Sequence, residues 1–395
     1  MNRSVVQNFI TVQQKVFLFL ICLRGLSEII NAFFWQSANY LTVMIIMIIS
    51  YFYLIPDFIL NHVRHQKFFF QEYGPILLYL VYLILRVNFT VFSLKFLLSE
   101  IIVYFFFIFV LENCRYNSLF KKRTEQIIIV FFKFSIIVGC VQLLLFFSHS
   151  FSFISLILER PVIGVYFHSN IYAIFILPLS IYFWQKEQYI WSIIAFISSV
   201  GTGTRSAFII FFLCLPIIFR LLKKQKITKK HFFIFLGLVV IFYVILIYYF
   251  YTKNIDYVTA DRLTANSFVW RLGIWNRLLQ DINGVFHWLF GATIGAAHVF
   301  VGKYMGVVEF APHNDYLKLL FDTGIIGFFL FLRIVVLILK RFFYVQLFAT
   351  FVPYILMLIF LFTDNYLFYT TALFLFVLIA IELSSKGSKN ENFAN

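Results

Sequence analysis

Residues 118–147 read SLFKKRTEQIIIVFFKFSIIVGCVQLLLFF, and this stretch decides the class of fold. Its apolar part, residues 127–147, holds a single charged residue, Lys133. At about 1.5 Å of rise per helical residue, this part is long enough to cross a hydrocarbon core about 30 Å thick. The basic run Lys121-Lys122-Arg123 lies just before it, as is typical of the cytoplasmic end of a span. The stretch therefore predicts a transmembrane helix.

Similar apolar runs recur along the whole chain. Of its 395 residues, 62% are hydrophobic and only 12% are charged, which excludes a soluble globular protein with a normally solvated surface. Runs of this length favour helices over a membrane barrel, whose strands would be short and alternating. We expect an all-α polytopic membrane protein with about twelve transmembrane helices. The expected spans lie near residues 16–34, 41–60, 74–90, 94–111, 127–147, 164–183, 187–200, 206–222, 232–251, 324–341, 344–362 and 366–383.

The basic residues predict the orientation of these spans. One set of alternate connections, with both tails, holds more than half of the 32 Lys and Arg residues. The short connections of the other set carry only Arg160 and Arg205. Because cytoplasmic loops are enriched in Lys and Arg, both termini are predicted to be cytoplasmic. The net charge of +15 is then a topology signal, so membrane lipids are expected partners and nucleic acid is not.

The longest connection, residues 252–323, falls outside the cytoplasm by parity. It divides the chain into residues 1–251 with spans one to nine, this outer loop, and residues 324–395 with spans ten to twelve and a cytoplasmic tail. Loops of such length are usually functional or disordered, and the aromatic content of this one favours a folded loop. We therefore expect it to cap the outer face of the membrane part.

Two helices are expected within the loop. Residues 267–282 have apolar side chains at helical spacing with basic residues between them, which is typical of a helix lying on a membrane surface. A second helix is expected to begin near His313, after Pro312, and to run to Asp322, before Gly324.

Four polar residues from separate parts of the chain are predicted to meet at the outer surface: Arg205, Arg271, His313 and Asp364. Arginine can grip phosphate oxygens with two parallel hydrogen bonds, so Arg205 and Arg271 would suit a lipid-linked diphosphate. Histidine accepts a proton readily near neutral pH, so His313 would suit an acceptor hydroxyl. Glycosyl transfer needs both a stabilised leaving group and a deprotonated acceptor.

Each candidate also has a purely structural interpretation. Arg271 and Arg277 could reach lipid headgroups from an amphipathic helix, and Arg205 could be an interfacial anchor. The trio His313-Asn314-Asp315 could form a helix N-cap, and for Asp364 a helix cap is favoured over catalysis. The residues considered for substrate contact are Asn314, Asp315, Tyr316, Asp364, Arg160, His168, Asn170 and Arg277.

Charges inside the expected spans suggest a transporter as a different class of function. These are Arg24, Glu28 and Lys133. Arg24 and Glu28 are four residues apart on one helix, so they could also pair with each other without any role in transport.

Six pieces of the sequence resemble the signature region of the O-antigen ligase and O-antigen polymerase (Wzy/WaaL) superfamily, over roughly residues 160–370. The downstream pieces are Arg271-Leu-Gly-Ile-Trp275, Leu289-Phe-Gly-Ala-Thr-Ile-Gly295, Pro312-His-Asn-Asp-Tyr-Leu317 and Asp322-Thr-Gly-Ile-Ile-Gly327, and the upstream ones are Gly164-Val-Tyr-Phe-His-Ser-Asn170 and Gly203-Thr-Arg-Ser-Ala207. One departure is that the family's Gly-x-Gly step is replaced by Gly291 and Gly295.

The resemblance implies a glycosyltransferase of the GT-C type in the bacterial inner membrane, with a periplasmic active site and no metal or cofactor. Its donor would be an oligosaccharide linked to undecaprenyl diphosphate, usually transferred with inversion. Arg205 and Arg271 would bind the diphosphate, and His313 would activate the acceptor hydroxyl or act next to it. Asp364 matches an acidic position of the family.

The motif Pro312-His-Asn-Asp-Tyr-Leu317 resembles the polymerase branch, so we expect an O-antigen polymerase that joins lipid-linked repeat units. A chain-length regulator and a flippase would then be expected partners. An O-antigen ligase, which transfers the glycan to the lipid A core, is the alternative. A non-enzymatic lipid-oligosaccharide flippase is a second alternative, although a carrier normally holds its key polar groups near the bilayer midplane.

Overall fold

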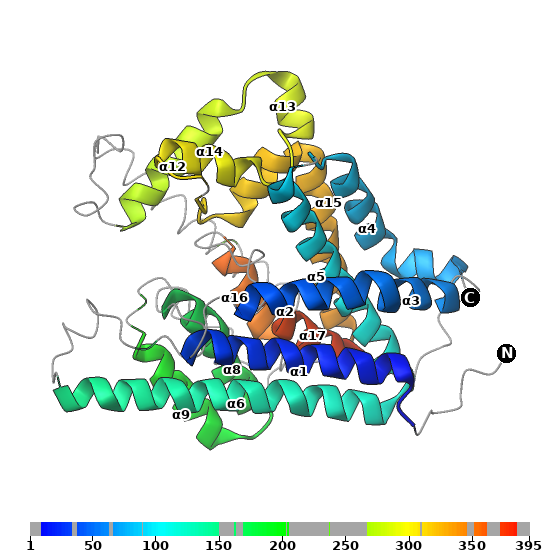
Figure 1. Cartoon of the computed structure of the whole chain (residues 1–395), viewed down its shortest axis with the longest axis vertical. Coiled ribbons are helices and arrows are strands. Elements are labelled where there is room, and N and C mark those ends of the chain that lie inside the picture. Colours follow the sequence, from blue (N-terminus) through cyan, green and yellow to red (C-terminus); the bar gives the residue numbers. More distant parts are fainter. Residues whose placement is uncertain are drawn as a thin grey trace.

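The computed structural model describes residues 9–33, 38–62, 66–88, 90–149, 162, 169–202, 204, 237, 267–308, 310–345, 351–361 and 372–384. Every regular element in these ranges is a helix (Figure 1). The helices are α1 (Val12–Phe33), α2 (Ala38–Ile49), a π-helical turn η1 (Ser50–Leu54), α3 (Ile55–His62), α4 (Gln66–Leu85), α5 (Val91–Tyr116), α6 (Ser118–His149), α8 (Ser169–Gln185), α9 (Tyr189–Val200), α12 (Ser267–Asp281), α13 (Gly284–Phe290), α14 (Ala296–Tyr304), α15 (Asp315–Val345), α16 (Phe351–Phe360) and α17 (Ala372–Leu383).

The all-α class is confirmed for the described part of the chain. Four helical stretches are long and apolar enough to cross a membrane: Thr42–Ile59, Ser93–Tyr116, Ser118–Ser148 and Asp315–Phe342. These stretches point to a membrane protein. The count of twelve spans and the three-part division of the chain stay predictions, because most of residues 205–266 lies outside the described residues.

Ion pairs join helix ends that the sequence assigns to the cytoplasm. Glu72, near the start of α4, accepts hydrogen bonds from Arg115 at the end of α5 and from Arg341 near the end of α15, the latter at 2.6 Å. Lys186, just after α8, lies 3.2 Å from Glu382 at the end of α17. The ends that meet are those that alternation along the chain places on one side, which agrees with the predicted order of these spans.

Helices α12, α13 and α14 form a small cluster, the cap, beside the start of α15 (Figure 1). The apolar face of α12 packs against α14 and α15 in a separate hydrophobic cluster. The members of this cluster are Ile274, Trp275, Leu278, Ile282, Ala297, Val301, Leu317 and Phe321. The helix predicted at 267–282 is therefore present, but the expectation that its apolar face lies on the membrane is wrong. Neighbouring helices bury that face instead.

Helix α13 exposes several apolar side chains of the cap. Val285 is 74% exposed and Phe286 is 69% exposed, and Trp288 also faces outward. The adjacent helix α4 exposes apolar residues at its end, including Leu85, and Tyr82 of α4 donates a hydrogen bond to the carbonyl of Phe290 at 3.3 Å. The exposed apolar surface of α4 thus continues onto α13.

Trp288 is expected to contact lipid. In the full-length protein reconstituted with brominated lipids, Trp288→Phe should remove part of the quenched tryptophan fluorescence, since bromine quenches only rings that it can approach. Trp275→Phe is the control, because Trp275 is 8% exposed within the cap. Equal quenching in the Trp288→Phe variant and the wild type would contradict lipid contact at α13.

Candidate functional site

The first turn of α15 carries the motif that the sequence singles out. Asn314 Oδ1 accepts a hydrogen bond from the backbone amide of Leu317 at 2.9 Å, which is an N-cap. His313, one residue earlier, has a backbone φ of +54°, in the left-handed region that residues other than glycine rarely adopt. The cap bond is therefore made by Asn314, and His313 is held in a backbone conformation of the kind that clusters at functional sites.

The next two residues tie this turn to α16. The backbone amide of Asp315 donates to the carbonyl of Leu361 at 2.7 Å, and Tyr316 Oη donates to the carbonyl of Leu358 at 2.8 Å. Asp315 is fully buried. These contacts fix the start of α15, and the substrate roles predicted for Asp315 and Tyr316 stay predictions.

Helix α12 is bonded to the same turn. Trp275 Nε1 donates to the carbonyl of Pro312, the residue before His313, at 2.9 Å. Arg271 precedes Trp275 by four residues and therefore lies on the same face of α12, about 6 Å away along the axis. A direct tertiary bond thus brings the helix that carries Arg271 to the turn that carries His313.

Arg277 lies elsewhere on α12. Its guanidinium carbon is 5.0 Å from the centre of the Tyr304 ring, at the end of α14. Six residues separate it from Arg271, so at 3.6 residues per turn the two side chains leave the helix in different directions. We interpret Arg277 as a packing contact between α12 and α14.

The other predicted site residues are not placed. Arg160, His168, Arg205 and Asp364 lie outside the described residues, and so does the side chain of Asn170 in the first turn of α8. The predicted meeting of Arg205 and Asp364 with His313 therefore stays a prediction.

A buried carboxylate holds the cap together. Asp322, 1% exposed, accepts hydrogen bonds from the amides of Gly295 at 3.0 Å and Ala297 at 2.8 Å, at the start of α14. Lys318 Nζ, one turn earlier on α15, lies 3.4 Å from Asp322 Oδ2. The helix α14 thus has an internal anion at its N-terminus, where the helix dipole favours negative charge.

His298 is a second buried polar residue close to this ion pair. The ring of His298, on α14, packs on Phe96 of α5 at 4.6 Å, and Lys318 Nζ lies 5.0 Å from the centre of the same Phe96 ring. Burial lowers the pKa of His298 well below its usual range, and the charges of Lys318 and His313 act in the same direction. His298 is therefore neutral at neutral pH. Its carbonyl accepts a hydrogen bond from the amide of Phe310 at 3.0 Å.

Two glycines interlock where the cap meets α15. Gly291 has φ +75° and Gly324 has φ +66°, and Gly324 interrupts the helical geometry of α15. A Cβ on Gly324 would overlap the carbonyl of Leu289 and the amide of Gly291. Gly295 also has a positive φ, at +84°. Gly291 and Gly295, the two glycines that replace the family's Gly-x-Gly step, therefore both have backbone angles that favour glycine.

Gly324→Ala is expected to destabilise the junction between cap and α15. The glycine-type backbone costs another residue about 1–3 kcal/mol, and overlap with fixed backbone adds about 1–3 kcal/mol. Thermal unfolding of the detergent-solubilised protein measures the loss. Gly74→Ala, in α4, is the control, because nothing lies within 4 Å of its Cβ position. Equal unfolding temperatures for Gly324→Ala and the wild type would contradict the interlock.

Residues 190–332 match the family model described as O-antigen ligase. The resemblance to the Wzy/WaaL superfamily is confirmed. The O-antigen ligase match contains Arg205, Arg271 and His313, and it does not separate the polymerase branch from the ligase branch. Members of the family are glycosyltransferase-like or ligase enzymes that act on lipid-linked oligosaccharides. No curated protein matches the chain.

Sequence reasoning missed several residues of the O-antigen ligase segment that shape this site. Asp322 was expected only as a helix end and as part of a family-like motif, and no role was predicted for Lys318. Their spacing of four residues on one helix is the signal of an ion pair, and it was available in the sequence. No local pattern indicated that Trp275 would bond Pro312 or that His298 would be buried.

Proposed function

We propose that this chain is an O-antigen polymerase, which joins undecaprenyl-diphosphate-linked repeat units on the periplasmic side of the inner membrane. The observation that carries the proposal is the bond from Trp275 to Pro312, because it joins the helix of Arg271 to the turn of His313. The family match over residues 190–332 supports the same class of substrate.

In this proposal, the anomeric carbon of the donor glycan loses its bond to the diphosphate oxygen and gains one to the acceptor hydroxyl. His313 takes the proton of that hydroxyl, or acts next to it, as the bond forms. The guanidinium group of Arg271 stabilises the negative charge that develops on the departing diphosphate. Arg205 is also proposed to stabilise the negative charge on the departing diphosphate.

The polymerase is preferred to the ligase on the resemblance of Pro312-His-Asn-Asp-Tyr-Leu317 to the polymerase branch. Both enzymes would use the same donor and differ in the acceptor. The ligase therefore remains the second candidate, and the acceptor decides between them.

The charges that suggested a transporter have local partners. Lys133 Nζ lies 4.7 Å from the centre of the Trp191 ring, and Arg24 donates to Ser27 Oγ at 2.9 Å. The side chain of Glu28 lies outside the described residues. These contacts supply structural roles for Lys133 and Arg24, which favours an enzyme over a carrier.

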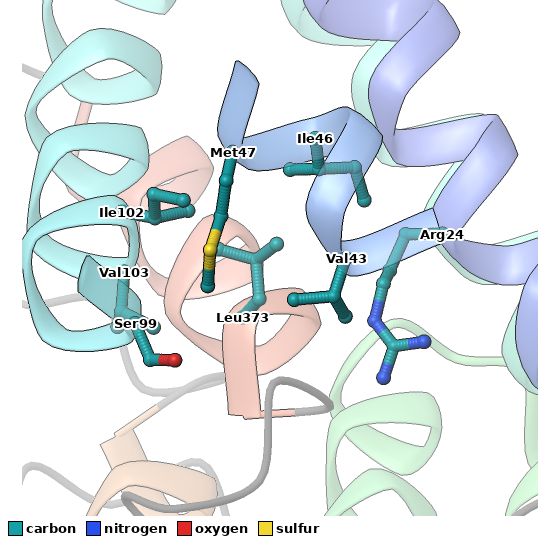
Figure 2. Close-up of a pocket in the computed structure, with 8 residues that line it drawn as sticks. All are labelled: Arg24, Val43, Ile46, Met47, Ser99, Ile102, Val103 and Leu373. Carbon is teal, nitrogen blue, oxygen red and sulfur yellow. The ribbon is translucent and has the colours of Figure 1, made fainter. Parts of the chain in front are cut away.

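The pocket beside Arg24 is also unlike a polar transport path (Figure 2). It is a small cavity of about 20 Å³ between α1, α2, α5 and α17. Arg24 and Ser99 are its polar lining residues, and the other six are Val43, Ile46, Met47, Ile102, Val103 and Leu373. An apolar lining of this kind suits hydrocarbon and not a hydrophilic cargo.

Deletion of the gene, followed by gel analysis of the lipopolysaccharide, tests the function. A core carrying one repeat unit is the result expected of a lost polymerase. A core with no O-antigen would indicate a ligase or a flippase instead. An unchanged ladder would reject all three functions, and restoration by the plasmid-borne gene is the control.

Arg271→Lys is expected to lose most of the transfer activity, on the order of 10- to 100-fold, since lysine keeps the charge but not the two parallel hydrogen bonds. The assay is the rate of polymer formation from lipid-linked repeat units by the reconstituted protein. Arg277→Lys is the matched control on the same helix, and it should stay close to wild type. If Arg271→Lys were as active as Arg277→Lys and the wild type, contact with lipid headgroups would be favoured as the role of Arg271.

A further inference from the structure

An open cleft lies between the cap and the start of α5, and the proposed reaction does not use it. Its cavity volume is about 420 Å³. Its polar lining residues include Asn88 and Thr90 before α5, Asp281 at the end of α12, His287 on α13, and Lys303 on α14. The ring of Phe300, also on α14, forms part of the wall.

The walls of this cleft are fixed by hydrogen bonds within the protein. Arg86 Nη2 donates to the carbonyl of Gly291 at 2.7 Å, and the amide of Ile294 donates to the carbonyl of Arg86 at 3.2 Å. On the other wall, the amide of Asn88 donates to Ser93 Oγ at 3.1 Å. A cleft whose walls are held in place before binding loses little entropy when a ligand enters.

The charges disfavour a phosphate as the occupant. The N-terminus of α14 reaches the cleft at Gly295, and a free helix start would attract an anion. Asp322 already accepts the amide hydrogens of Gly295 and Ala297, so this attraction is satisfied internally. Among the lining residues, Asp281 and Lys303 carry opposite charges, which leaves little net charge to bind an ion.

The same set of groups suits a neutral sugar. A carboxylate accepts hydrogen bonds from hydroxyls, an ammonium donates to them, and an amide and a threonine hydroxyl do both. An aromatic ring offers an apolar surface for the C–H face of a pyranose. Pockets that combine apolar walls with a few placed polar groups are the usual form of small-molecule sites.

The cleft lies next to the proposed reaction site and is separate from it. The carbonyl of His298 on α14 accepts a hydrogen bond from Phe310, whose ring centre lies 5.9 Å from that of His313. Phe300 and Lys303 of the same helix line the cleft. One short helix therefore separates the turn of His313 from the cleft. A glycan several sugars long could reach from one to the other.

We propose that this cleft binds neutral sugar residues of the oligosaccharide substrate, beyond the sugar that reacts. The proposal rests on the proposed function for the identity of the glycan. The cleft would then hold the glycan by its uncharged part, while the diphosphate is held elsewhere.

Binding of the free repeat-unit oligosaccharide, released from the lipopolysaccharide of the same bacterium, tests the proposal on the full-length protein in nanodiscs. The wild type should bind it in calorimetry, and the double variant Asp281→Asn with Lys303→Gln should bind at least about 10-fold more weakly. Asp57→Asn, in α3, is the matched control. Unfolding temperatures equal to wild type show that the variants are folded.

The outcomes separate this proposal from the proposed function. His313→Ala should keep the oligosaccharide affinity of the wild type although transfer is lost. No binding by the wild type, or equal binding by the double variant, would overturn the cleft proposal. Competition by inorganic pyrophosphate at the cleft would also overturn it, because it would reveal an anion site. An unchanged lipopolysaccharide ladder after gene deletion would reject the transferase instead, whatever the binding result.

Discussion

Asp322→Ala is expected to unfold the cap. The carboxylate is buried, accepts the two amide hydrogens at the start of α14 and lies 3.4 Å from Lys318 Nζ, which is itself buried. Its removal leaves a buried ammonium without this partner and two amides without their acceptor. Breaking one side of a buried ion pair costs about 3–5 kcal/mol. Thermal unfolding and limited proteolysis within residues 267–308 would measure the loss.

Two further variants show which part of the effect is electrostatic. Asp322→Asn keeps an oxygen acceptor but no charge, so it should lie between Asp322→Ala and the wild type. The double variant Asp322→Ala with Lys318→Met removes both charges, and it should recover part of the lost stability. If Asp322→Ala were as stable as the wild type, the ion pair would not hold the cap.

His313→Ala is expected to abolish transfer while the protein still folds. Loss of a general base typically lowers a rate by about 10²–10⁴-fold. The cap of α15 is made by Asn314, and that bond should survive the substitution. The measurement is polymer formation by the reconstituted variant, together with its amount in the membrane and its unfolding temperature.

His313→Gly separates the side chain from the backbone. Because φ at this position is +54°, alanine would be strained there, whereas glycine adopts the same conformation freely. We expect His313→Gly to accumulate normally and to be as inactive as His313→Ala. An active His313→Gly would show that the position contributes only its backbone shape. Asn314→Ala is the comparison for capping, with an expected stability loss of about 1 kcal/mol.

Much of the helical architecture followed from local features of the sequence. The long apolar runs predicted helices over residues 94–111 and 127–147, and the structure places α5 and α6 there. Helical spacing predicted a helix over 267–282, and α12 covers 267–281. The break expected at Gly324 is present as a residue with non-helical angles inside α15. Such features depend on a few adjacent residues, so one sequence suffices to find them.

The partners of these helices depended on contacts between distant residues. The sequence correctly predicted an amphipathic α12 but wrongly placed its apolar face on the membrane. Burial against lipid and burial against a neighbouring helix both remove that face from water, so the pattern alone does not distinguish them. Likewise, the sequence predicted that His313 and Arg271 meet, but it did not indicate which contact would bring their elements together. The bond that links their elements spans 37 residues from Trp275 to Pro312.

The sequence by itself determined that the described chain is helical and membrane-like, and its motifs indicated the superfamily. Only the tertiary structure decided that α12 packs within the protein, that Asn314 makes the helix cap, and that Asp322 holds α14. The physical reason is that the length of an apolar run and the position of a glycine determine the local backbone conformation through residues that are adjacent in the sequence. Burial and ion pairing depend instead on which distant surfaces meet when the chain folds.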